Sequence, residues 1–340
     1  MPDEELNQDD DLFIHHHIIA DQKQSMLRID KFLMDRLPNV TRNRIQGAIK
    51  EGFIKVNEKT IKSNYKVRPS DEIKIYLPEP PRDTEVVAEN IQLNITYEDD
   101  DLLIVNKPAG MVVHPAFNNW NGTLVNGLAY HFQQLPVMKD NEGRPGLVHR
   151  IDKDTSGLLV IAKNESSMTH LAKQFFNHTI ERTYYALVWG TPSPENGIIN
   201  VNLGRSLKDR RITTAFPEGD FGRNAITHYK TLEDLRYVSL IQCNLETGRT
   251  HQIRAHMKYL GHPLFNDVTY GGDKILKGTV FSKYKSFVEN CFKIINRQAL
   301  HAKTLGFIHP STNQPVKFES ELPEDFQNVL TKWREYVKYN

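Results

Sequence analysis

The stretch G-L-V-H-R-I-D-K-D-T-S-G-L-L-V-I-A-K, residues 146–163, places charged side chains directly before an apolar run. Residues 158–162 of this run are aliphatic, which predicts a buried strand. Charged side chains beside a buried strand lose hydration, and this costs free energy unless the charges are paired. A hydrophobic core alone therefore gives no reason for their presence. Five residues carry this signal: His149, Arg150, Asp152, Lys153 and Asp154. They indicate a functional site or a salt-bridged turn, and the pattern alone does not decide between the two.

A second polar stretch, L-E-T-G-R-T-H-Q-I-R-A-H-M-K-Y-L-G-H-P, covers residues 245–263. Thr250 is placed to cap a helix and Gly261 to end it. Ile253 and Met257 fall on the buried side of this helix, and Arg254 lies beside them. Because a partly buried arginine needs an anionic partner, we expect a carboxylate against Arg254.

The histidines and cysteines do not have the spacing of a metal site. His251, His256 and His262 are separated by five and six residues, which places them on different sides of the predicted helix. Cys243 and Cys291 stand alone, without a C-x-x-C pair. The sequence therefore predicts no metal, no zinc site and no disulfide framework, which suits a reducing cytoplasm.

The charges are distributed unevenly along the 340 residues, although the net charge is only +1. Residues 1–27 hold seven acids and one lysine, whereas residues 28–76 hold twelve basic and six acidic residues. Such a basic region is typical of a phosphate-binding surface, and a solvated charged face is the alternative. The N-terminus lacks the segments of a signal peptide, and no apolar run is long enough to cross a bilayer. The sequence predicts a cytoplasmic protein.

The basic region has the pattern of a small α+β module. Residues 28–37 carry apolar side chains at helical spacing. Thr41 is placed to cap a second helix, and Gly52 is placed to end it in a left-handed conformation. Residues 54–56 and 73–77 alternate between apolar and polar side chains and predict short strands.

This module resembles the S4 RNA-binding domain. The resemblance rests on R-I-D-K-F-L at 28–33, T-R-N-R-I-Q at 41–46, I-K-E-G-F-I-K-V-N at 49–57 and K-V-R-P-S-D-E-I at 66–73. In that family the basic face of the two helices holds structured RNA. The resemblance implies RNA contacts for five residues, for which solvated charge is the alternative: Arg28, Lys31, Arg42, Arg44 and Lys50.

The rest of the chain predicts a larger α+β domain behind a proline-rich linker. L-P-E-P-P-R begins at residue 77, and proline both fixes its own backbone angle and removes a hydrogen-bond donor. Strands are predicted at 102–106, 111–113, 158–162, 184–189, 226–232 and 237–245, and helices at 168–176 and 325–337. We expect an acidic tail at 1–26, the S4 domain at 27–78, a linker at 79–90 and a catalytic domain at 91–338.

Four stretches of this larger region resemble the RluA family of pseudouridine synthases. The family signature H-R-L-D-x-x-T-S-G occurs as H-R-I-D-K-D-T-S-G at 149–157. The others are Y-E-D-D-D-L-L-I-V-N-K-P-A-G-M-V-V-H-P at 97–115, R-T-Y-Y-A at 182–186 and H-A-K-T-L-G-F-I-H-P at 301–310. Departures from the family pattern are Ile151 for leucine, Arg182 for lysine, and Asn266 where glycine and aspartate usually follow G-H-P. The resemblance implies the pseudouridine synthase fold, a mixed and mainly antiparallel sheet with flanking helices and a central RNA-binding cleft.

Members of this family isomerise uridine to pseudouridine in RNA without a cofactor, because no atom is gained or lost and a carboxylate can act as nucleophile or base. The resemblance implies that Asp152 is that carboxylate, that Arg254 pairs with it and that Tyr184 stacks on the uracil. Arg150 is implied to fill the gap that remains when the target base is flipped out. A hydrolase with a carboxylate pair is another reading, and Asp154 is the one acid close to Asp152 in sequence.

The pairing of an S4 domain with V-V-H-P-A and G-L-V-H-R-I-D-K-D-T is most similar to the D-type enzymes that act on large-subunit (23S) ribosomal RNA. The expected substrate is a stem-loop of the helix 69 type, alone or in a pre-ribosomal particle, and RNA contacts are also implied for His149 and Arg249. The expected enzyme is a monomer with no small-molecule cofactor. The alternative is a non-catalytic S4-type RNA-binding or ribosome-assembly factor, against which Asp152, Tyr184 and Arg254 argue.

Overall fold

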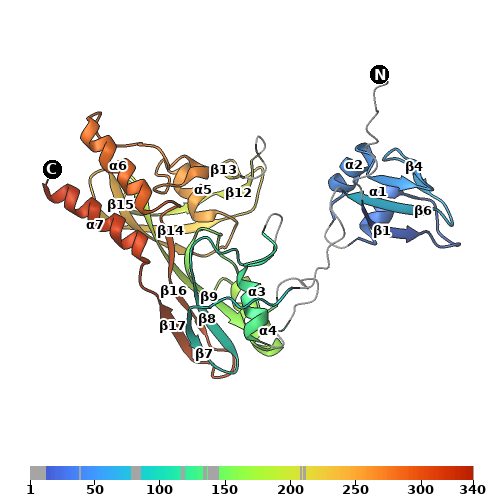
Figure 1. Cartoon of the computed structure of the whole chain (residues 1–340), viewed down its shortest axis with the longest axis horizontal. Helices are drawn as coiled ribbons and strands as arrows, with labels where there is room; N and C mark the ends of the chain where they lie inside the picture. Colours follow the sequence, from blue (N-terminus) through green and yellow to red (C-terminus); the bar gives the residue numbers. More distant parts are fainter. Residues whose placement is uncertain are drawn as a thin grey trace, which may run out of the picture. The chain divides into compact units, whose positions relative to one another are not determined.

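The computed structural model describes residues 13–37, 40–77, 86–115, 119–132, 136, 145–206, 209 and 212–339. The chain divides into two compact units, Met1–Thr84 and Glu85–Asn340, and each is described by itself (Figure 1). The domain boundaries that the sequence predicts stay predictions, because most of the linker expected at 79–90 lies outside the described residues.

Unit 1 is a small α+β domain in which two helices pack on a four-stranded sheet. Its elements are β1 (Phe13–Ile19), β2 (Leu27–Arg28), α1 (Ile29–Met34), α2 (Arg42–Lys50), β3 (Ile54–Val56), β4 (Lys59–Thr60), β5 (Lys66–Val67) and β6 (Glu72–Leu77). The sheet has the order β1-β6-β3-β4, and β2 pairs with β5. Its core includes Phe32 and Leu33 of α1, Ile45 and Ile49 of α2, and Ile73 of β6. The apolar residues of α1 and α2 recur at helical spacing, so each helix buries one face.

Two details of unit 1 differ from what the sequence predicts. Strand β1 lies within the range expected to be an acidic tail, and it pairs antiparallel with β6, with Ile18 opposite Ile73. The stretch F-I-H-H-H-I-I does not alternate strictly, so the strand is defined by the hydrogen-bonding partners that β6 supplies. Thr41 precedes α2 as predicted, but its side chain makes no capping hydrogen bond. Gly52 follows that helix with φ 78°, as expected.

Unit 2 is built on one nine-stranded sheet with the order β11-β14-β15-β10-β16-β9-β8-β7, and β17 pairs with β16. The strand pairs are antiparallel except β16 with β9, which is parallel. The strands are β7 (Ile95–Glu98), β8 (Leu102–Lys107), β9 (Ser156–Ala162), β10 (Glu181–Trp189), β11 (Asn196–Asn200), β14 (Ile226–Asp234), β15 (Val238–Leu245), β16 (Leu300–Ile308) and β17 (Pro315–Glu319). A separate ribbon pairs β12 (Asn202–Arg205) with β13 (Thr213–Phe216).

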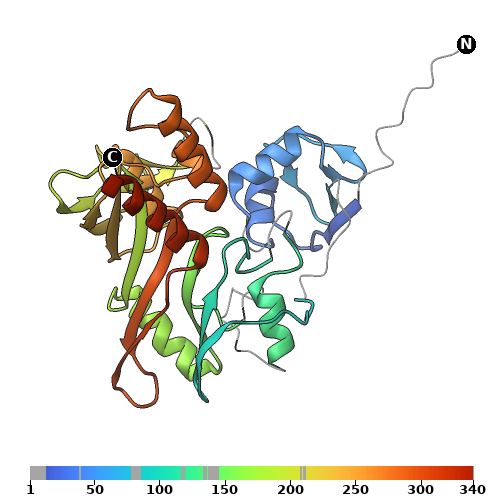
Figure 2. The ribbon, with the colours of Figure 1, turned by 60° about the vertical axis from the view of Figure 1, so that its left-hand side comes forward.

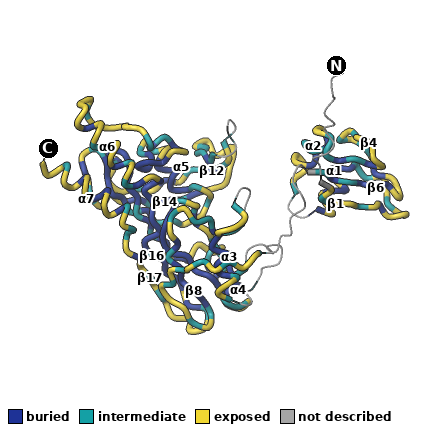
Figure 3. The backbone as a smooth tube through the Cα atoms, in the orientation of Figure 1, coloured by how far each residue is buried: buried dark blue, intermediate teal, exposed yellow. Residues whose placement is uncertain are grey.

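Helices cover both faces of this sheet. They are α3 (Leu124–His131), α4 (Glu165–Phe176), α5 (Gln252–Tyr259), α6 (Ser282–Ile294) and α7 (Glu324–Tyr339), with a short 3-10 turn η1 (Val268–Tyr270). Successive residues of β8, β9 and β10 alternate between the two faces of the sheet. One face packs on α3 and α5 in a single core, and the other packs on α4 in a second core and on α6 and α7 in a third. Helices α6 and α7, orange and red, lie side by side in both views (Figures 1 and 2). The central strands between these layers are mostly buried (Figure 3).

The α+β class and most predicted elements of unit 2 are confirmed. Residues 111–113 are not a strand: the carbonyl groups of Val112 and Val113 accept hydrogen bonds from the first residues of α3. Helices α3 and α6 were not among the predicted elements. Helix α3 has a signal in the sequence, because Thr123 and Asn126 form a capping box at its start. Among the residues that the structure describes, no helix has the length and apolar character needed to cross a membrane.

Candidate active site

A cavity of about 530 Å³ lies between the end of α4, strand β10 and the start of α5. One wall is formed by residues 148–155, here called the Asp152 loop, which lead into β9. Of the described residues that line the cavity, five carry a full charge: Arg150, Arg182, Arg249, Arg254 and Asp152. Four cations around one carboxylate make this cavity attractive to an anionic ligand.

Lys107, at the end of β8, holds the Asp152 loop in place. Its buried ammonium group donates hydrogen bonds to the carbonyl oxygens of Pro108, Met111 and Lys153 at 2.7, 2.8 and 2.9 Å. The amide of Gly110 donates to the same Lys153 carbonyl at 3.0 Å. Because Lys153 directly follows Asp152, these bonds restrict the position of the Asp152 carboxylate.

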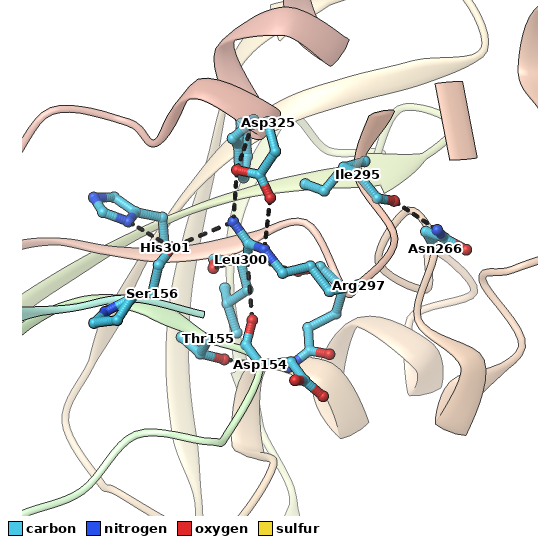
Figure 4. Close-up of polar contacts among 12 residues, drawn as sticks. Asp154, Thr155, Ser156, Asn266, Ile295, Arg297, Leu300, His301 and Asp325 are labelled. Atoms are coloured by element: carbon cyan, nitrogen blue, oxygen red, sulfur yellow. Dashed lines mark hydrogen bonds and ion pairs between the residues drawn. The ribbon is translucent and has the colours of Figure 1, made fainter. Parts of the chain in front are cut away.

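Arg297 holds the next residues of the loop (Figure 4). Its guanidinium donates to the carbonyl oxygens of Asp154 at 3.0 Å and Leu300 at 3.3 Å. The same group makes two hydrogen bonds, of 2.8 and 3.0 Å, to Asp325 in the first turn of α7. Arg297 is buried, so the Asp325 charge compensates the loss of its hydration. The C-terminal helix thus contributes to the rigidity of the loop.

Arg254 joins two carboxylates. Its Nε and Nη2 donate to the two oxygens of Asp267 at 2.7 and 2.8 Å, and its Nη1 donates to Asp152 Oδ2 at 3.2 Å. The side chain of Asp267 is completely buried, whereas that of Asp152 is 20% exposed and lines the cavity. Burial opposes the charged form of Arg254, but the hydrogen bonds and charge of Asp267 outweigh it and raise the pKa of the guanidinium. The two partners therefore keep Arg254 charged and oriented toward Asp152.

The sequence reasoning expected one carboxylate against Arg254 and missed Asp267. A signal was present, because Asp267 comes two residues after the apolar P-L-F at 263–265, and an acid in an apolar setting needs a partner. The preceding Asn266, noted only as a departure from the family pattern, has φ 56° and donates to the carbonyl of Ile295 at 2.6 Å. Asn266 thus anchors the turn that places Asp267 against Arg254.

Helix α5 begins after His251, and the prediction that Thr250 caps it is wrong. His251 adopts φ 55°, an unfavourable conformation for a side chain with a Cβ, so surrounding contacts must stabilise it. Its Nδ1 lies 3.1 Å from the hydroxyl of Tyr270, and its Nε2 lies 3.9 Å from Asp152 Oδ2. Burial lowers the pKa of His251, and the nearby Asp152 charge opposes that shift. Sequence reasoning considered His251 only as a metal ligand and missed its position in the cavity.

Tyr184, which is buried, and His149, which is partly buried, both line the cavity. Tyr184 is 7% exposed, and burial raises the pKa of its hydroxyl. The Nε2 of His149 accepts a hydrogen bond from the Val160 amide at 3.0 Å, and its ring stacks on Phe175 with 4.6 Å between centroids. Burial and the charge of Arg182 lower the pKa of His149 to about 3, so the ring is neutral. These contacts tie His149 to β9 and α4, and its predicted RNA contact stays a prediction.

Arg182 is a buried cation in the cavity wall. Its Nη2 donates to the carbonyl oxygen of Glu246 at 3.2 Å, and its guanidinium carbon lies 5.5 Å from the Phe175 ring centroid. Within the described residues its Nε has no hydrogen-bond partner, and burial lowers the pKa of the group. A Cβ atom on Gly248 would lie 2.8 Å from Arg182 Nη1. Gly248 therefore leaves the space that this guanidinium occupies.

The remaining predicted site residues are less tightly held. Arg150 is exposed at the cavity, and Arg249 Nε donates to the carbonyl oxygen of Asn224 at 3.0 Å. In unit 1, Arg28 and Arg42 both bond the buried Asp30, each at 2.9 Å, which uses part of their hydrogen-bonding capacity inside the domain. Lys31, Arg44 and Lys50 are exposed. Their predicted contacts with RNA stay predictions.

One cluster of the described residues could offer ligands to a metal ion: Asp99, Asp101 and His309. His309 Nε2 lies 2.8 Å from Asp99 Oδ2, and Asp99 also accepts hydrogen bonds from the amides of Asp101 and Leu102 at 2.8 and 2.9 Å. These bonds connect the β7–β8 turn to the end of β16. The cluster therefore has a structural role outside the cavity.

The comparisons with known proteins fit this geometry. Residues 101–259 match the family model described as RNA pseudouridylate synthase, and residues 27–73 match the S4 domain model. A protein of Chlorobaculum parvum called an uncharacterized RNA pseudouridine synthase is 48% identical over 92% of this chain and 95% of its own length. The chain belongs to the RNA pseudouridine synthase family. Its enzymatic class and its N-terminal S4 domain, both implied by the sequence motifs, are thereby confirmed.

Other members of the family extend this relationship. The ribosomal large subunit pseudouridine synthase D of Zymomonas mobilis is 40% identical over 88% of this chain and 92% of its own length. The solved structure of human RNA pseudouridylate synthase domain containing 1 is similar with a TM-score of 0.52. It is 24% identical and covers 74% of this chain and 97% of its own. That structural similarity supports the fold.

Proposed function

We propose that this RNA pseudouridine synthase acts on large-subunit ribosomal RNA and that Asp152 is its catalytic carboxylate. The observation that carries the proposal is the position of Asp152, a single acid in a cavity lined by four arginines and hydrogen-bonded to Arg254. An acid that is oriented by a buried arginine and is still accessible from the cavity can meet a bound nucleotide. Asp154 does not line the cavity, so a carboxylate pair for hydrolysis finds no support among the described residues.

The reaction breaks the bond between sugar C1′ and uracil N1, turns the base, and joins C1′ to C5. The hydrogen on C5 leaves as a proton and N1 gains one, so the composition of the RNA does not change. In this proposal Asp152 acts on the nucleotide as nucleophile or base. Arg254 orients the carboxylate through its charge-assisted hydrogen bond of 3.2 Å. Tyr184, which lines the same cavity, stacks on the uracil.

Base flipping is a further part of the proposal. The walls of the cavity bury Tyr184 and Arg254, so a base that is stacked in a helix cannot reach Asp152. The target nucleotide must leave its stack, as it does for other enzymes that modify bases. Arg150 is exposed beside Asp152, and its length and charge suit it to fill the gap in the RNA.

The proposed RNA substrate rests on the relatives and on the S4 domain. Two relatives of about 40% identity, from Zymomonas mobilis and Neisseria meningitidis, carry names that assign them to the large ribosomal subunit. A stem-loop of the helix 69 type is the proposed target, within ribosomal RNA or a pre-ribosomal particle in the cytoplasm, and the proposed enzyme is a monomer. The exposed Lys31, Arg44 and Lys50 would bind phosphates of the same RNA.

The test uses the full chain and an unmodified transcript of large-subunit ribosomal RNA that carries tritium on uracil C5. Product formation releases tritium, and mapping of the product locates the modified uridines. We expect release from a small number of sites in one stem-loop without added metal or nucleotide. No release from this transcript, together with release from transfer RNA, would overturn the proposed substrate. RNA binding without any release would favour the non-catalytic assembly factor.

A further inference from the structure

A second cavity, here called the ribbon groove, adjoins the candidate active site. It has a volume of about 740 Å³ and lies between the β12–β13 ribbon, the loop at 221–223 and the residues before α5. Gly248, Arg249 and His251 line both cavities, so the two spaces share a wall. In Figure 1 β12 and β13 lie close to α5, and β13 packs against that helix. An RNA strand with one nucleotide in the active-site cavity therefore has the ribbon groove next to it.

The lining of the ribbon groove favours an anion. Three arginines line it, namely Arg205, Arg223 and Arg249, and no carboxylate is among the described residues of its lining. The backbone of Arg223 is fixed, because its amide and carbonyl each bond Leu203 of β12 at 2.9 Å. The side chain of Arg223 is exposed. The fixed backbone keeps Arg223 at the groove, and its guanidinium can bind a phosphate there.

The same groove contains a fixed aromatic ring. Phe221 is 47% exposed, although its ring packs on Phe216 in a tilted arrangement with 4.9 Å between centroids. Gly204 makes room for it, because a Cβ there would lie 3.0 Å from the Phe221 ring. Gly222 has φ 82°, and a Cβ on it would lie 2.5 Å from the Leu203 carbonyl oxygen. The two glycines thus leave room for a large apolar ring at the surface, on which a base can stack.

We propose that the ribbon groove binds the strand adjacent to the target uridine, with Arg223 on a phosphate and Phe221 stacked on an unpaired base. Alternation of cations and an exposed aromatic ring is how proteins bind single-stranded nucleic acid. The inference rests on the proposed function, because it takes RNA as the ligand of the neighbouring cavity. Its consequence is that the enzyme recognises more than the flipped nucleotide and needs an unstacked neighbour on one side.

The test compares full-length Arg223→Ala and Phe221→Ala with wild type on the ribosomal transcript and on its shortest fragment that the wild type modifies. Loss of one stacked base weakens binding about 5- to 150-fold, so we expect KM for Phe221→Ala to rise within this range. For Arg223→Ala we expect a higher KM and a salt dependence of binding that is reduced by about 0.7 in slope. The single-turnover rate at saturating RNA should change by less than about twofold. Lys338→Ala, a loss of the same charge at the end of α7, should behave as wild type.

Removing nucleotides from the fragment identifies the occupant. Wild type should lose affinity when the nucleotides next to the uridine are removed from one side, and Phe221→Ala should no longer respond to that removal. The proposal that the groove binds RNA would be overturned if KM were unchanged in both variants. It would also be overturned if all variants lost affinity equally when the fragment is shortened. Phe221→Leu distinguishes stacking from folding, because leucine retains apolar packing but has no ring on which a base can stack. If the wild type binds the RNA but forms no pseudouridine, the proposed function fails. The RNA affinities of the wild type and the two variants can still be compared, and they test the groove separately.

Discussion

Asp267 is the residue whose removal tests the arrangement of the site most sharply. It does not line the cavity, yet it makes two of the three carboxylate hydrogen bonds of Arg254. Asp267→Asn keeps the size of the side chain and removes its charge. One oxygen remains as an acceptor, and the new amide group faces the guanidinium with two donors of its own. Arg254 is then expected to shift toward Asp152 or to lose its orientation.

The expected magnitude follows from burial. Removing one partner of a buried ion pair typically costs about 3–5 kcal/mol, and the retained oxygen places Asp267→Asn near the lower end, at about 3 kcal/mol. For the reaction, a displacement of about 1 Å in a positioning group costs about 100-fold in rate. We therefore expect the single-turnover rate of the folded variant to fall by about 100-fold, with little change in the affinity for RNA.

The assay measures tritium release at saturating RNA and unfolding by urea on the same preparation. Glu233→Gln is the control, because Glu233 forms a comparable ion pair with Arg334, with three hydrogen bonds of 2.7–3.1 Å on an exposed surface. That pair is partly solvated, so its loss should cost less than about 1 kcal/mol and leave the rate unchanged. If Asp267→Asn kept its rate within about twofold and its stability within about 0.5 kcal/mol, the idea that Asp267 positions Arg254 would be refuted.

Three further predictions concern the surroundings of the site. Arg254→Lys should keep the fold but lower the single-turnover rate by about 10-fold or more, because lysine cannot bond Asp267 through two nitrogens and reach Asp152 as well. Gly248→Ala should destabilise unit 2 by about 1 kcal/mol, because its Cβ would meet Arg182 Nη1 at 2.8 Å and the end of that side chain can shift. Arg182→Lys should relieve part of that cost, and urea unfolding of the double variant would show strictly additive losses if the contact were unimportant. Burial lowers the pKa of His256 to about 4 from 6.5, so the unfolded state takes up more protons and stability falls as the pH drops from about 6.5 toward 4. His256 therefore lowers the free energy of unfolding by roughly 2 kcal/mol when the pH falls from about 7.5 to 5. Over this pH range, the stability that the wild type has in excess of His256→Asn should shrink by the same amount, as measured by urea unfolding.

Residues with strong local patterns could be predicted from the sequence. The aliphatic run of β9 and the helical spacing of α7 are determined by their own side chains, and both elements are where the sequence places them. The Asp152 loop was recognised because its charges precede a buried strand. The approach of Arg254 to Asp152 was inferred from the family resemblance, and the structure gives a distance of 3.2 Å between Nη1 and Oδ2.

What the sequence did not predict depends on contacts between distant segments. Strand β1 exists because β6 pairs with it. His251 has a positive φ and lies in contact with the hydroxyl of Tyr270, a residue from a later segment. Asp267 acts through a turn that Asn266 anchors to Ile295, far along the chain. Lys107 and Arg297 hold the Asp152 loop through backbone carbonyl groups, which have no signature in the side-chain pattern. In each case the residue that determines the structure lies too far along the chain to be part of the local sequence pattern.

The central claim is that the Asp152 carboxylate performs the isomerisation, and Asp152→Asn tests it most directly. Asparagine has nearly the same shape and can still accept a hydrogen bond from Arg254, so folding and RNA affinity should be close to those of wild type. The measurement is single-turnover tritium release from C5-labelled ribosomal RNA, with enzyme in excess and binding confirmed on the same RNA. We expect no release above the background without enzyme. Release by Asp152→Asn at a rate close to that of wild type would contradict the account.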